Sequence, residues 1–279
     1  MKKKIVLIGA NGLIGKTFIE EYSSKYKIIK CLKTDDISKI LKKSKPSIIF
    51  NSSGVPYDEE KMFDSNLILV KKIIDYCLKS KCFFIHLGSS GEYGRHRKAT
   101  SETSELRPTT IYEGTKAAAS MLIKGYAISK KIKAIIVRPY CVFGYHSKRN
   151  LLIPMIINTI IKNTKMKIYK GVHDFIYVKD FIKGIDKIIA QENKCNPGEV
   201  INLGSGKQLS NFKVLKEIQQ VFKSFGKGKF KIINRKYRSY DSDFWMCDTK
   251  YSKLKYKFKC TYTFRKALID IRNYYISNK

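Results

Sequence analysis

The sequence is poor in the residues that build metal sites and disulfide frameworks. It contains four histidines and seven cysteines among 279 residues, and no two cysteines form a C-x-x-C pair. Zinc sites need such closely spaced ligands, and the disulfide frameworks of secreted domains use an even number of cysteines. We therefore expect no metal centre and reduced, mostly buried thiols, as in a cytosolic protein.

Long hydrophobic runs are also missing. The longest apolar stretch, residues 151–161, contains Pro154 and Asn158 and is shorter than the roughly 18 residues of a membrane span. The first residues, MKKKIVLIG, resemble the basic start of a secretory signal. However, their apolar run ends after four residues at Gly9, short of the roughly 7–15 residues that such a signal needs. These absences predict a cytoplasmic protein without a membrane partner.

Acidic residues are scarce. Asp and Glu number 23 against 56 Lys and Arg, which gives a formal net charge of +33. Lysine supplies 47 of these basic residues, and they are spread along the chain rather than gathered in an arm or a motif. Nucleic-acid surfaces concentrate their charge and use arginine for bidentate contacts, so we expect no specific nucleic-acid partner. A basic surface favours small anionic substrates such as nucleotide diphosphates.

The chain does contain a regular alternation of short β-rich runs with longer helical patterns. Strands are predicted at residues 4–8, 26–32, 47–50, 83–87 and 134–137, and helices at residues 13–23, 37–43, 66–79 and 115–129. This alternation is typical of a doubly wound parallel sheet with helices on both faces.

The pattern loosens after Gly144, where helices are predicted at residues 151–162, 178–190 and 212–225. We therefore predict an α/β fold with two parts. A Rossmann-type domain covers residues 1–145, and residues 172–205 partly return to it. A smaller C-terminal α/β substrate domain is formed by residues 146–171 and 206–279.

A glycine-rich turn joins the first predicted strand to the first helix. Residues 9–15 read G-A-N-G-L-I-G. Glycines allow a tight turn and a close approach of the backbone to a pyrophosphate, and the helix N-terminus adds free N–H groups and partial positive charge. The position of this turn between strand and helix predicts a dinucleotide site.

The G-x-x-G-x-x-G spacing resembles that of the extended short-chain dehydrogenase/reductase family, also called the NAD-dependent epimerase/dehydratase family. The resemblance implies a Rossmann-type fold, a nicotinamide cofactor and a nucleotide-diphosphate sugar as substrate. It also implies a homodimer in which the helices around residues 66–79 and 112–129 pair. The cofactor contacts that it implies are Gly9, Asn11, Gly12, Leu13, Ile14, Gly15, Lys33, Asp36, Ser52, Tyr112 and Lys116.

Family members use a Tyr-x-x-x-Lys pair on a helix and a Ser or Thr after the preceding strand. Seven such pairs occur in this lysine-rich chain, but only Tyr112 and Lys116 follow R-P and run into A-A-A, as the family pattern requires. A spacing of four stacks both side chains on one helix face. We expect the Lys116 ammonium to lower the pKa of Tyr112, which would serve as the acid–base group.

The catalytic serine comes from the segment G-S-S-G-E-Y-G at residues 88–94, which is similar to the family's (S/T)-x-x-x-Y-G. Ser89 is the expected catalytic hydroxyl, and Ser90 is the alternative. Sugar 4,6-dehydratases carry Asp-Glu after this residue, whereas this chain has Ser90 and Gly91. Glu92 stands one position too late. The segment is most similar to nucleotide-sugar 4-ketoreductases such as reductases of GDP-4-keto-6-deoxymannose.

Cofactor choice depends on the end of the second strand. NAD-binding members carry an acid there, about 18 residues past the last glycine, to bond the ribose hydroxyls. Here that position is Lys33, whose ammonium would attract a 2′-phosphate, so the sequence favours NADP(H) with NAD(H) as the alternative. Asp36 matches the acid that often bonds the adenine amino group in the family.

The substrate contacts implied by the resemblance are Ser89, Ser90, Cys141 and Arg238. Cys141 replaces the asparagine of the family's R-P-x-N-V-x-G, and Arg238 matches the arginine of R-x-G-D that clamps the diphosphate. An arginine fork suits two phosphate oxygens.

Three functions remain open from the sequence. The first is an NADPH-dependent reductase of the C4 keto group of a nucleotide-diphosphate 4-keto-6-deoxysugar, in the biosynthesis of activated sugars for surface glycans. The second is a nucleotide-sugar 4-epimerase with a tightly bound NAD. The third, of another class, is a catalytically silent cofactor-binding protein.

Overall fold

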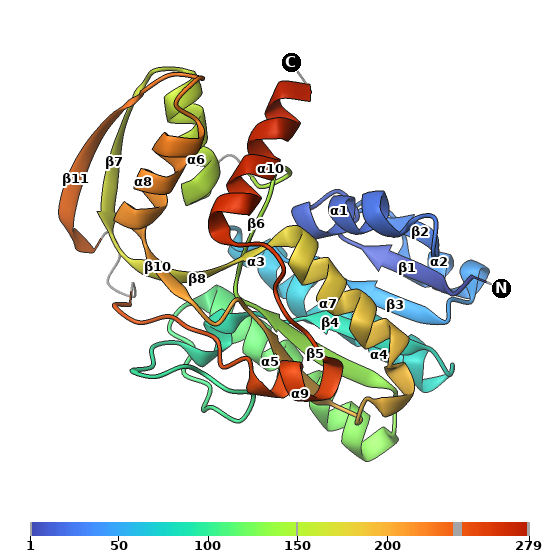
Figure 1. The fold of residues 1–279 in the computed structure, drawn as a ribbon. Coiled ribbons are helices and arrows are strands. Elements are labelled where there is room, and N and C mark those ends of the chain that lie inside the picture. Colours follow the sequence, from blue (N-terminus) through green and yellow to red (C-terminus); the bar gives the residue numbers. More distant parts are fainter. Residues whose placement is uncertain (1, 149, 237–241, 278–279) are drawn as a thin grey trace.

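A six-stranded, fully parallel sheet forms the centre of the molecule in the computed structural model, which describes residues 2–148, 150–236 and 242–277. The strand order is β2-β1-β3-β4-β5-β9 (Figure 1). The bounds are β1 (Lys4–Ile8), β2 (Lys27–Cys31), β3 (Ile48–Asn51), β4 (Phe83–Leu87), β5 (Ala134–Pro139) and β9 (Glu199–Leu203). All four residues of β3 and all five of β4 are buried, as expected for strands covered on both faces.

Helices cover both faces of this sheet. Alternate residues of β4 point to opposite faces: Phe83, Ile85 and Leu87 join one hydrophobic cluster, and Phe84 joins the other. The first cluster contains residues of α1 (Leu13–Tyr22) and α7 (Val178–Ala190), and the second contains residues of α2 (Ile37–Ser44), α4 (Leu69–Leu78) and α5 (Ile111–Lys130). The predicted Rossmann-type α/β fold is therefore confirmed.

The strand order places the topological switch point between β1 and β3. From β1 the chain moves outward to β2 and then returns to β3 on the other side. Open α/β sheets bind ligands at such a point, in the crevice beyond the carboxyl ends of the strands. The glycine turn after β1 and the loop after β3 both lie at this edge.

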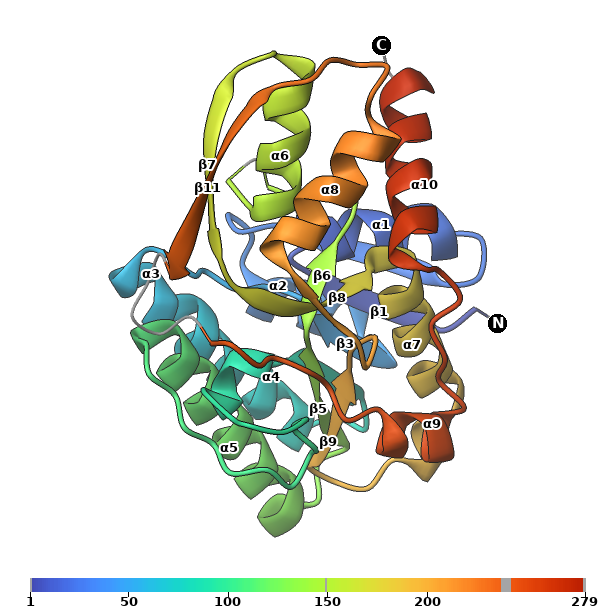
Figure 2. The ribbon, with the colours of Figure 1, turned by 60° about the vertical axis from the view of Figure 1, so that its left-hand side comes forward.

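The remaining strands form two smaller sheets. One has the order β10-β8-β6, with β6 (Cys141–Phe143), β8 (Val172–Tyr177) and β10 (Gln208–Ser210). The other is the parallel pair β7 (Lys165–Lys170) and β11 (Lys229–Lys236), which flanks α6 (Leu152–Ile161) and α8 (Asn211–Val221) in Figures 1 and 2. The C-terminal part adds α9 (Lys250–Tyr256) and α10 (Phe264–Ser277).

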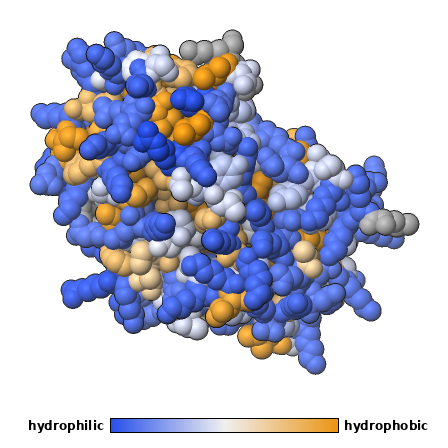
Figure 3. Space-filling model, in the orientation of Figure 1, coloured by the Kyte–Doolittle hydropathy of each residue, from blue (hydrophilic) through white to orange (hydrophobic). Residues whose placement is uncertain are grey.

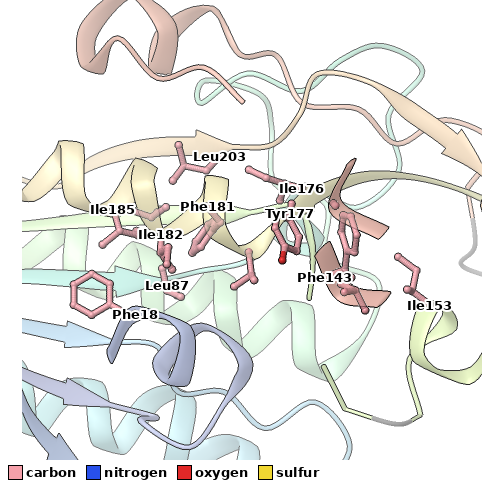
Figure 4. Packing of buried hydrophobic residues seen from close by; sticks show 14 of the residues in the cluster. Phe18, Leu87, Phe143, Ile153, Ile176, Tyr177, Phe181, Ile182, Ile185 and Leu203 are labelled. Carbon is pink, nitrogen blue, oxygen red and sulfur yellow. The ribbon is translucent and has the colours of Figure 1, made fainter. Parts of the chain in front are cut away.

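These elements pack onto the large sheet without a separate core. One cluster runs from Phe18 of α1 and Leu87 of β4 through Phe143 to Ile153 of α6 (Figure 4). The short elements between the main ones are α3 (Glu59–Phe63), the π-helical turn η1 (Asp64–Ile68), and the 3-10 turns η2 (Ser90–Tyr93) and η3 (Glu192–Lys194).

Two predicted helix starts differ from the observed ones. The helix predicted to begin at residue 66 is preceded by α3 and η1, so helical structure begins at Glu59. The helix predicted to begin at residue 115 begins at Ile111, because Thr110 and Glu113 form a capping box there. The second difference places Tyr112 in the first turn of α5.

The surface reflects the lysine-rich composition. Hydrophilic residues dominate the face in Figure 3, and apolar residues form scattered patches. Within the described residues, no helix combines the length and the hydrophobicity that crossing a membrane requires.

Candidate functional site

The glycine turn after β1 is closed too tightly for side chains. Gly9 has φ +80°, and a Cβ atom on it would lie 2.9 Å from the backbone nitrogen of Ser53. A Cβ atom on Gly15 would collide with the carbonyl oxygen of Gly9. Gly12 donates its N–H to that same oxygen over 3.0 Å and forms the N-cap of α1 without any side-chain cap. The first N–H groups of α1 are thus left for an external anion, which fits a pyrophosphate.

The predicted contacts around this turn lie at the carboxyl edge of the sheet. Asn11 is exposed, and Leu13 and Ile14 are half-buried. Ser52 directs its hydroxyl to the carbonyl oxygen of Ile8 over 2.7 Å. Ser52 therefore braces the end of β1 against the loop that follows β3.

The loop after β2 carries the two residues expected to read the adenosine end of the cofactor. Lys33 is exposed; hydrogen bonds from Lys61 lower the pKa of Asp58, and the charges of Lys61 and Lys33 add smaller effects in the same direction. Asp36 caps α2, because its Oδ1 accepts the N–H groups of Ser38 at 2.9 Å and Lys39 at 3.2 Å. Lys33 thus faces solvent, while the Asp36 carboxylate is already engaged by the helix N-terminus.

Lys116 lies buried at the ends of two neighbouring strands. Its Nζ donates to the carbonyl oxygen of Ser53 at 3.1 Å and to that of Leu87 at 2.9 Å. Burial lowers the pKa of Lys116 to about 8, with the charge of Glu92 acting in the opposite direction. A lysine has three N–H donors, so two are used by backbone carbonyls and one is left for a bound hydroxyl group.

Tyr112 owes its position to the start of α5. The Thr110 hydroxyl accepts the N–H of Glu113 over 3.2 Å, and the Glu113 carboxylate accepts the N–H of Thr110 over 3.1 Å. This capping box begins the helix one residue before Tyr112, so that Lys116 follows one turn later on the same face.

The structure brings Tyr112 and Ser89 together. The Ser89 side chain acts to lower the pKa of Tyr112, but burial dominates and raises that pKa to about 12. The expected lowering by Lys116 is therefore wrong, because the ammonium is directed to two carbonyl oxygens and the phenol is desolvated. Of the two candidate serines, Ser89 is the one whose side chain influences Tyr112.

Glu92 holds in place the segment of residues 88–94, which we call the serine loop. One carboxylate oxygen accepts the N–H of Ser89 over 2.7 Å, and the other lies 2.8 Å from both Nε and Nη2 of Arg138. Gly88 leaves the room for this carboxylate, since a Cβ atom there would overlap Glu92 Oε1. Both oxygens of a fully buried carboxylate are thus occupied. The S-x-x-E spacing of a capping box was the sequence signal that could have revealed this role.

A second layer of contacts supports Arg138. The guanidinium carbon lies 4.6 Å from the centre of the Tyr93 ring, and the Tyr93 hydroxyl donates to Asn202 Oδ1 over 2.8 Å. Arg138 belongs to the segment that matches the family's R-P-x-N-V-x-G, and Asn202 lies in β9. Here Tyr93 and Asn202 hold Arg138 in position, and Arg138 in turn holds Glu92 and the serine loop.

Sequence reasoning did not single out Asn66, which lies on the π-helical turn η1. It is fully buried, and its Nδ2 donates to Thr115 Oγ1 over 3.0 Å, directly beside Lys116. Its Oδ1 has no hydrogen-bond partner among the described residues. Single π-turns often mark functional sites, and a polar residue at the start of an apolar helix was the only available signal.

A small cavity of about 10 Å³ opens next to the serine loop. Its lining includes Ser90 and Tyr93 from that loop and the aromatic side chains of Phe244 and Trp245. The indole N–H of Trp245 is buried and has no hydrogen-bond partner in the described part of the chain. The cavity therefore offers aromatic walls, a hydroxyl group and one unused donor.

Cys141 and Arg238 are the two remaining residues that were predicted to contact the substrate. Cys141 is half-buried in β6, where it is in register with Phe175 of β8. Arg238 lies outside the described residues. Within the described ranges, no group of three or more His, Cys, Asp or Glu side chains could hold a metal ion.

Comparison with known proteins gives relatives that include proteins named as dehydratases and epimerases of nucleotide sugars. A dTDP-D-glucose 4,6-dehydratase of Dictyostelium discoideum is 24% identical over 222 residues, which cover 72% of this chain and 50% of that protein. The human dTDP-D-glucose 4,6-dehydratase is 28% identical over 144 residues, or 50% of this chain and 40% of that protein. The chain thus spans about half the length of the curated relatives it matches.

Solved structures share the whole fold. A dTDP-glucose 4,6-dehydratase of Bacillus anthracis in complex with NAD superposes with a TM-score of 0.87 at 19% identity, covering 99% of this chain and 97% of that one. A UDP-N-acetylglucosamine 4-epimerase of Methanobrevibacter ruminantium gives a TM-score of 0.88 at 20% identity, with both chains fully covered. The model of the NAD dependent epimerase/dehydratase family matches residues 5–204, well over half of the sequence. The chain therefore belongs to the NAD dependent epimerase/dehydratase family.

Proposed function

We propose that the protein is an NADPH-dependent reductase of the C4 keto group of a nucleotide-diphosphate 4-keto-6-deoxysugar. The observation that carries the proposal is the placement of Tyr112 beside Ser89 and one helical turn from the buried Lys116. All three lie at the sheet edge that also bears the glycine turn. The resemblance of the serine loop to that of 4-ketoreductases supports the specific reaction.

Each residue of this set has a separate task. The nicotinamide supplies the hydride when the cofactor is bound. Tyr112 delivers a proton to the sugar oxygen at C4, and the Ser89 hydroxyl bonds the same oxygen and orients it. Lys116 uses its remaining N–H donor on a ribose hydroxyl, while the carbonyl groups of Ser53 and Leu87 hold the ammonium in position.

Reduction and epimerisation would use the same residues. In a reductase Tyr112 delivers a proton to the C4 oxygen, whereas in a 4-epimerase it first removes the proton of the C4 hydroxyl. The epimerase with a tightly bound NAD is the second candidate, supported by the structural similarity to 4-epimerases.

Dehydration is disfavoured by the same loop. The positions that hold Asp and Glu in 4,6-dehydratases are Ser90 and Gly91 here. The nearest carboxylate, Glu92, has both oxygens bound to Ser89 and Arg138. No acid of this loop is free to protonate a leaving hydroxyl group, although curated relatives are named as dehydratases.

NADP(H) remains our proposal for the cofactor, because the exposed Lys33 lies at the start of the loop after β2, where its ammonium would meet a 2′-phosphate. Similar solved structures were determined with NAD, so NAD(H) is the alternative.

We further propose that residues 1–145 and 172–205 bind the cofactor and that the remainder of the chain binds the sugar nucleotide.

A homodimer is the proposed assembly. Large apolar side chains are exposed on α5 and on the turn before α4, with Met121 56% exposed, Ile128 61% and Ile68 52%. Pairing of this helical face with a second copy would remove these side chains from water. Sedimentation of the purified protein gives the oligomeric state directly.

The decisive experiment combines cofactor extraction with a turnover assay. Freshly purified protein is denatured and the released nucleotide is identified, and NADPH oxidation is then followed with a panel of nucleotide-diphosphate 4-keto-6-deoxysugars. We expect little bound NAD and NADPH consumption with one sugar. Tightly bound NAD with interconversion of C4 epimers would establish the epimerase instead. Absence of both reactions, with cofactor binding intact, would leave the silent binding protein.

A further inference from the structure

Two cysteines meet at the turn that joins α4 to β4. Cys77 lies in the last turn of α4, and Cys82 directly precedes β4. Their Sγ atoms are 3.3 Å apart, and the Ser80 hydroxyl lies 3.2 Å from Cys82 Sγ. Both cysteines are 3% exposed. The two thiols are therefore in direct contact beneath a three-residue turn.

Little movement would be needed to join the two sulfur atoms. A disulfide has an S–S distance of about 2.0 Å, so the gap would have to shrink by about 1.3 Å. The turn between the two cysteines is short and carries exposed Lys79 and Lys81. Closing the gap would take rotation of the two side chains and a shift of this turn.

We propose that Cys77 and Cys82 form a reversible redox modification site that hydrogen peroxide converts into an intramolecular disulfide. Peroxide is the fitting oxidant, because thiols that are 3% exposed admit a small molecule more readily than a bulky disulfide. The chemistry needs only the two thiols and one peroxide molecule, and it is independent of the sugar reaction proposed above.

The attacking group is Cys82. Its hydrogen bonds with Cys77 and Ser80 lower the pKa of Cys82, whereas the bond to Cys82 and burial raise the pKa of Cys77. The Cys82 thiolate attacks one peroxide oxygen, the O–O bond breaks, and hydroxide leaves and is protonated to water. Cys82 is then a sulfenic acid.

Cys77 resolves this intermediate. Its sulfur attacks the sulfur of Cys82, the S–O bond breaks, and the leaving hydroxide takes up the Cys77 proton as water. Two thiols are thus oxidised by two electrons, one peroxide is reduced, and two water molecules are released. A thiol reductant returns both cysteines to the starting state.

The disulfide would link two elements that position Lys116. The helical segment ending in α4 carries Asn66, which bonds Thr115 beside Lys116, and β4 ends at Leu87, whose carbonyl oxygen accepts from Lys116. The thiol pair lies at the opposite ends of these elements, so oxidation would tie them together away from the site.

The test uses the full chain in reduced form. It is treated with hydrogen peroxide, the reaction is quenched, and the protein is denatured and alkylated with iodoacetamide before intact-mass measurement and peptide mapping. We expect alkylation at the five other cysteines of the seven, a Cys77–Cys82 linked peptide, and full alkylation after reduction. Seven alkylated cysteines after oxidation, Cys82 as a sulfinic acid beside a free Cys77, or a disulfide to another cysteine would each overturn the proposal.

Serine variants separate the disulfide from general oxidation. Cys77→Ser should abolish the linked peptide and leave Cys82 as a sulfenic acid, which dimedone traps when it is added together with the denaturant. Cys31→Ser, which removes a buried thiol of β2, is the matched control and should leave the yield of linked peptide unchanged. Melting curves of both variants establish that they are folded. A linked peptide that requires Cys31, or Cys82 that resists dimedone in folded Cys77→Ser, would contradict the mechanism.

Discussion

Replacing Lys116 by methionine should stabilise the cofactor-free protein while removing its function. Lys116 is a buried ammonium whose pKa is lowered from 10.5 to about 8. Since one pKa unit corresponds to about 1.4 kcal/mol, holding this charge in the folded state opposes folding by about 3 kcal/mol at neutral pH. Methionine has a similar length and no charge.

Part of this gain is lost because two hydrogen bonds disappear. The carbonyl oxygens of Ser53 and Leu87 accept from Lys116, and each unpaired buried group opposes folding by about 1 kcal/mol. The free energy of unfolding of Lys116→Met should therefore exceed that of the wild type by about 1 kcal/mol at pH 7. Cofactor binding should be lost, as expected when a functional group is removed in favour of stability.

The pH dependence of this difference follows from the direction of the shift. Between about pH 8 and pH 10.5 the unfolded chain keeps the Lys116 proton while the folded chain has released it. The unfolded state then binds more protons, so rising pH stabilises the wild type through this group. The advantage of Lys116→Met is complete below pH 8 and shrinks as the pH rises above it.

Urea unfolding at pH 7, 8 and 9.5 measures this effect, with all other lysines common to both proteins. Lys72→Met, at an exposed position of α4, is the control and should differ from the wild type by the same amount at each pH. A stability difference for Lys116→Met that is independent of pH, or a loss of stability that grows toward pH 7, would refute the reasoning.

Four further expectations concern the site itself. Tyr112→Phe should lower turnover by at least about 10²-fold, the scale of a positioned acid–base group, with the Kd for NADPH nearly unchanged; turnover within a few-fold of wild type would remove Tyr112 from the mechanism. Lys33→Asp should weaken NADPH binding by roughly 10–100-fold, and less so as salt rises, because repulsion replaces attraction of a phosphate; a titration that finds unchanged NADPH affinity would make Lys33 irrelevant to cofactor choice. Gly15→Ala forces a methyl group onto the Gly9 carbonyl. It should lower the free energy of unfolding by about 1–3 kcal/mol and also weaken cofactor binding. Gly125→Ala, which has open space around it, should instead stabilise α5 by up to about 1 kcal/mol in the same urea assay. Trp245 is the single tryptophan of the chain and lines the cavity beside the serine loop. Binding of a nucleotide sugar should therefore change its fluorescence, while cofactor alone should have little effect. Equal responses to both ligands would place the sugar elsewhere.

Local patterns in the sequence were sufficient to predict the architecture. The strands at residues 4–8 and 83–87 coincide with β1 and β4, and the helix at residues 178–190 coincides with α7. Each of these segments is built from residues that are close in sequence and whose apolar periodicity matches their burial. The glycine turn was likewise readable, because a positive φ at Gly9 and the close approach at Gly15 are properties of a short segment.

The ends of the functional helices were harder to predict. Apolar periodicity begins only after Tyr112, so the helix was expected from residue 115, whereas hydrogen bonds between Thr110 and Glu113 start it at Ile111. Asn66 escaped notice because its role depends on the π-turn and on Thr115 of another helix. The helix cap that Asp36 provides for α2 also went unpredicted, and its match to adenine recognition stays a prediction.

The sequence by itself determined the α/β class, the position of the glycine turn and the choice of Tyr112, Lys116 and the serine loop as candidates, because short spacings and residue types carry that information. Only the tertiary structure decided what these groups can do. The state of Lys116 depends on carbonyl oxygens of Ser53 and Leu87, which are 63 and 29 residues away along the chain, and Glu92 is committed to Arg138, 46 residues away. Desolvation and charge pairing are set by atoms that folding brings together, and no local spacing in the sequence specifies them.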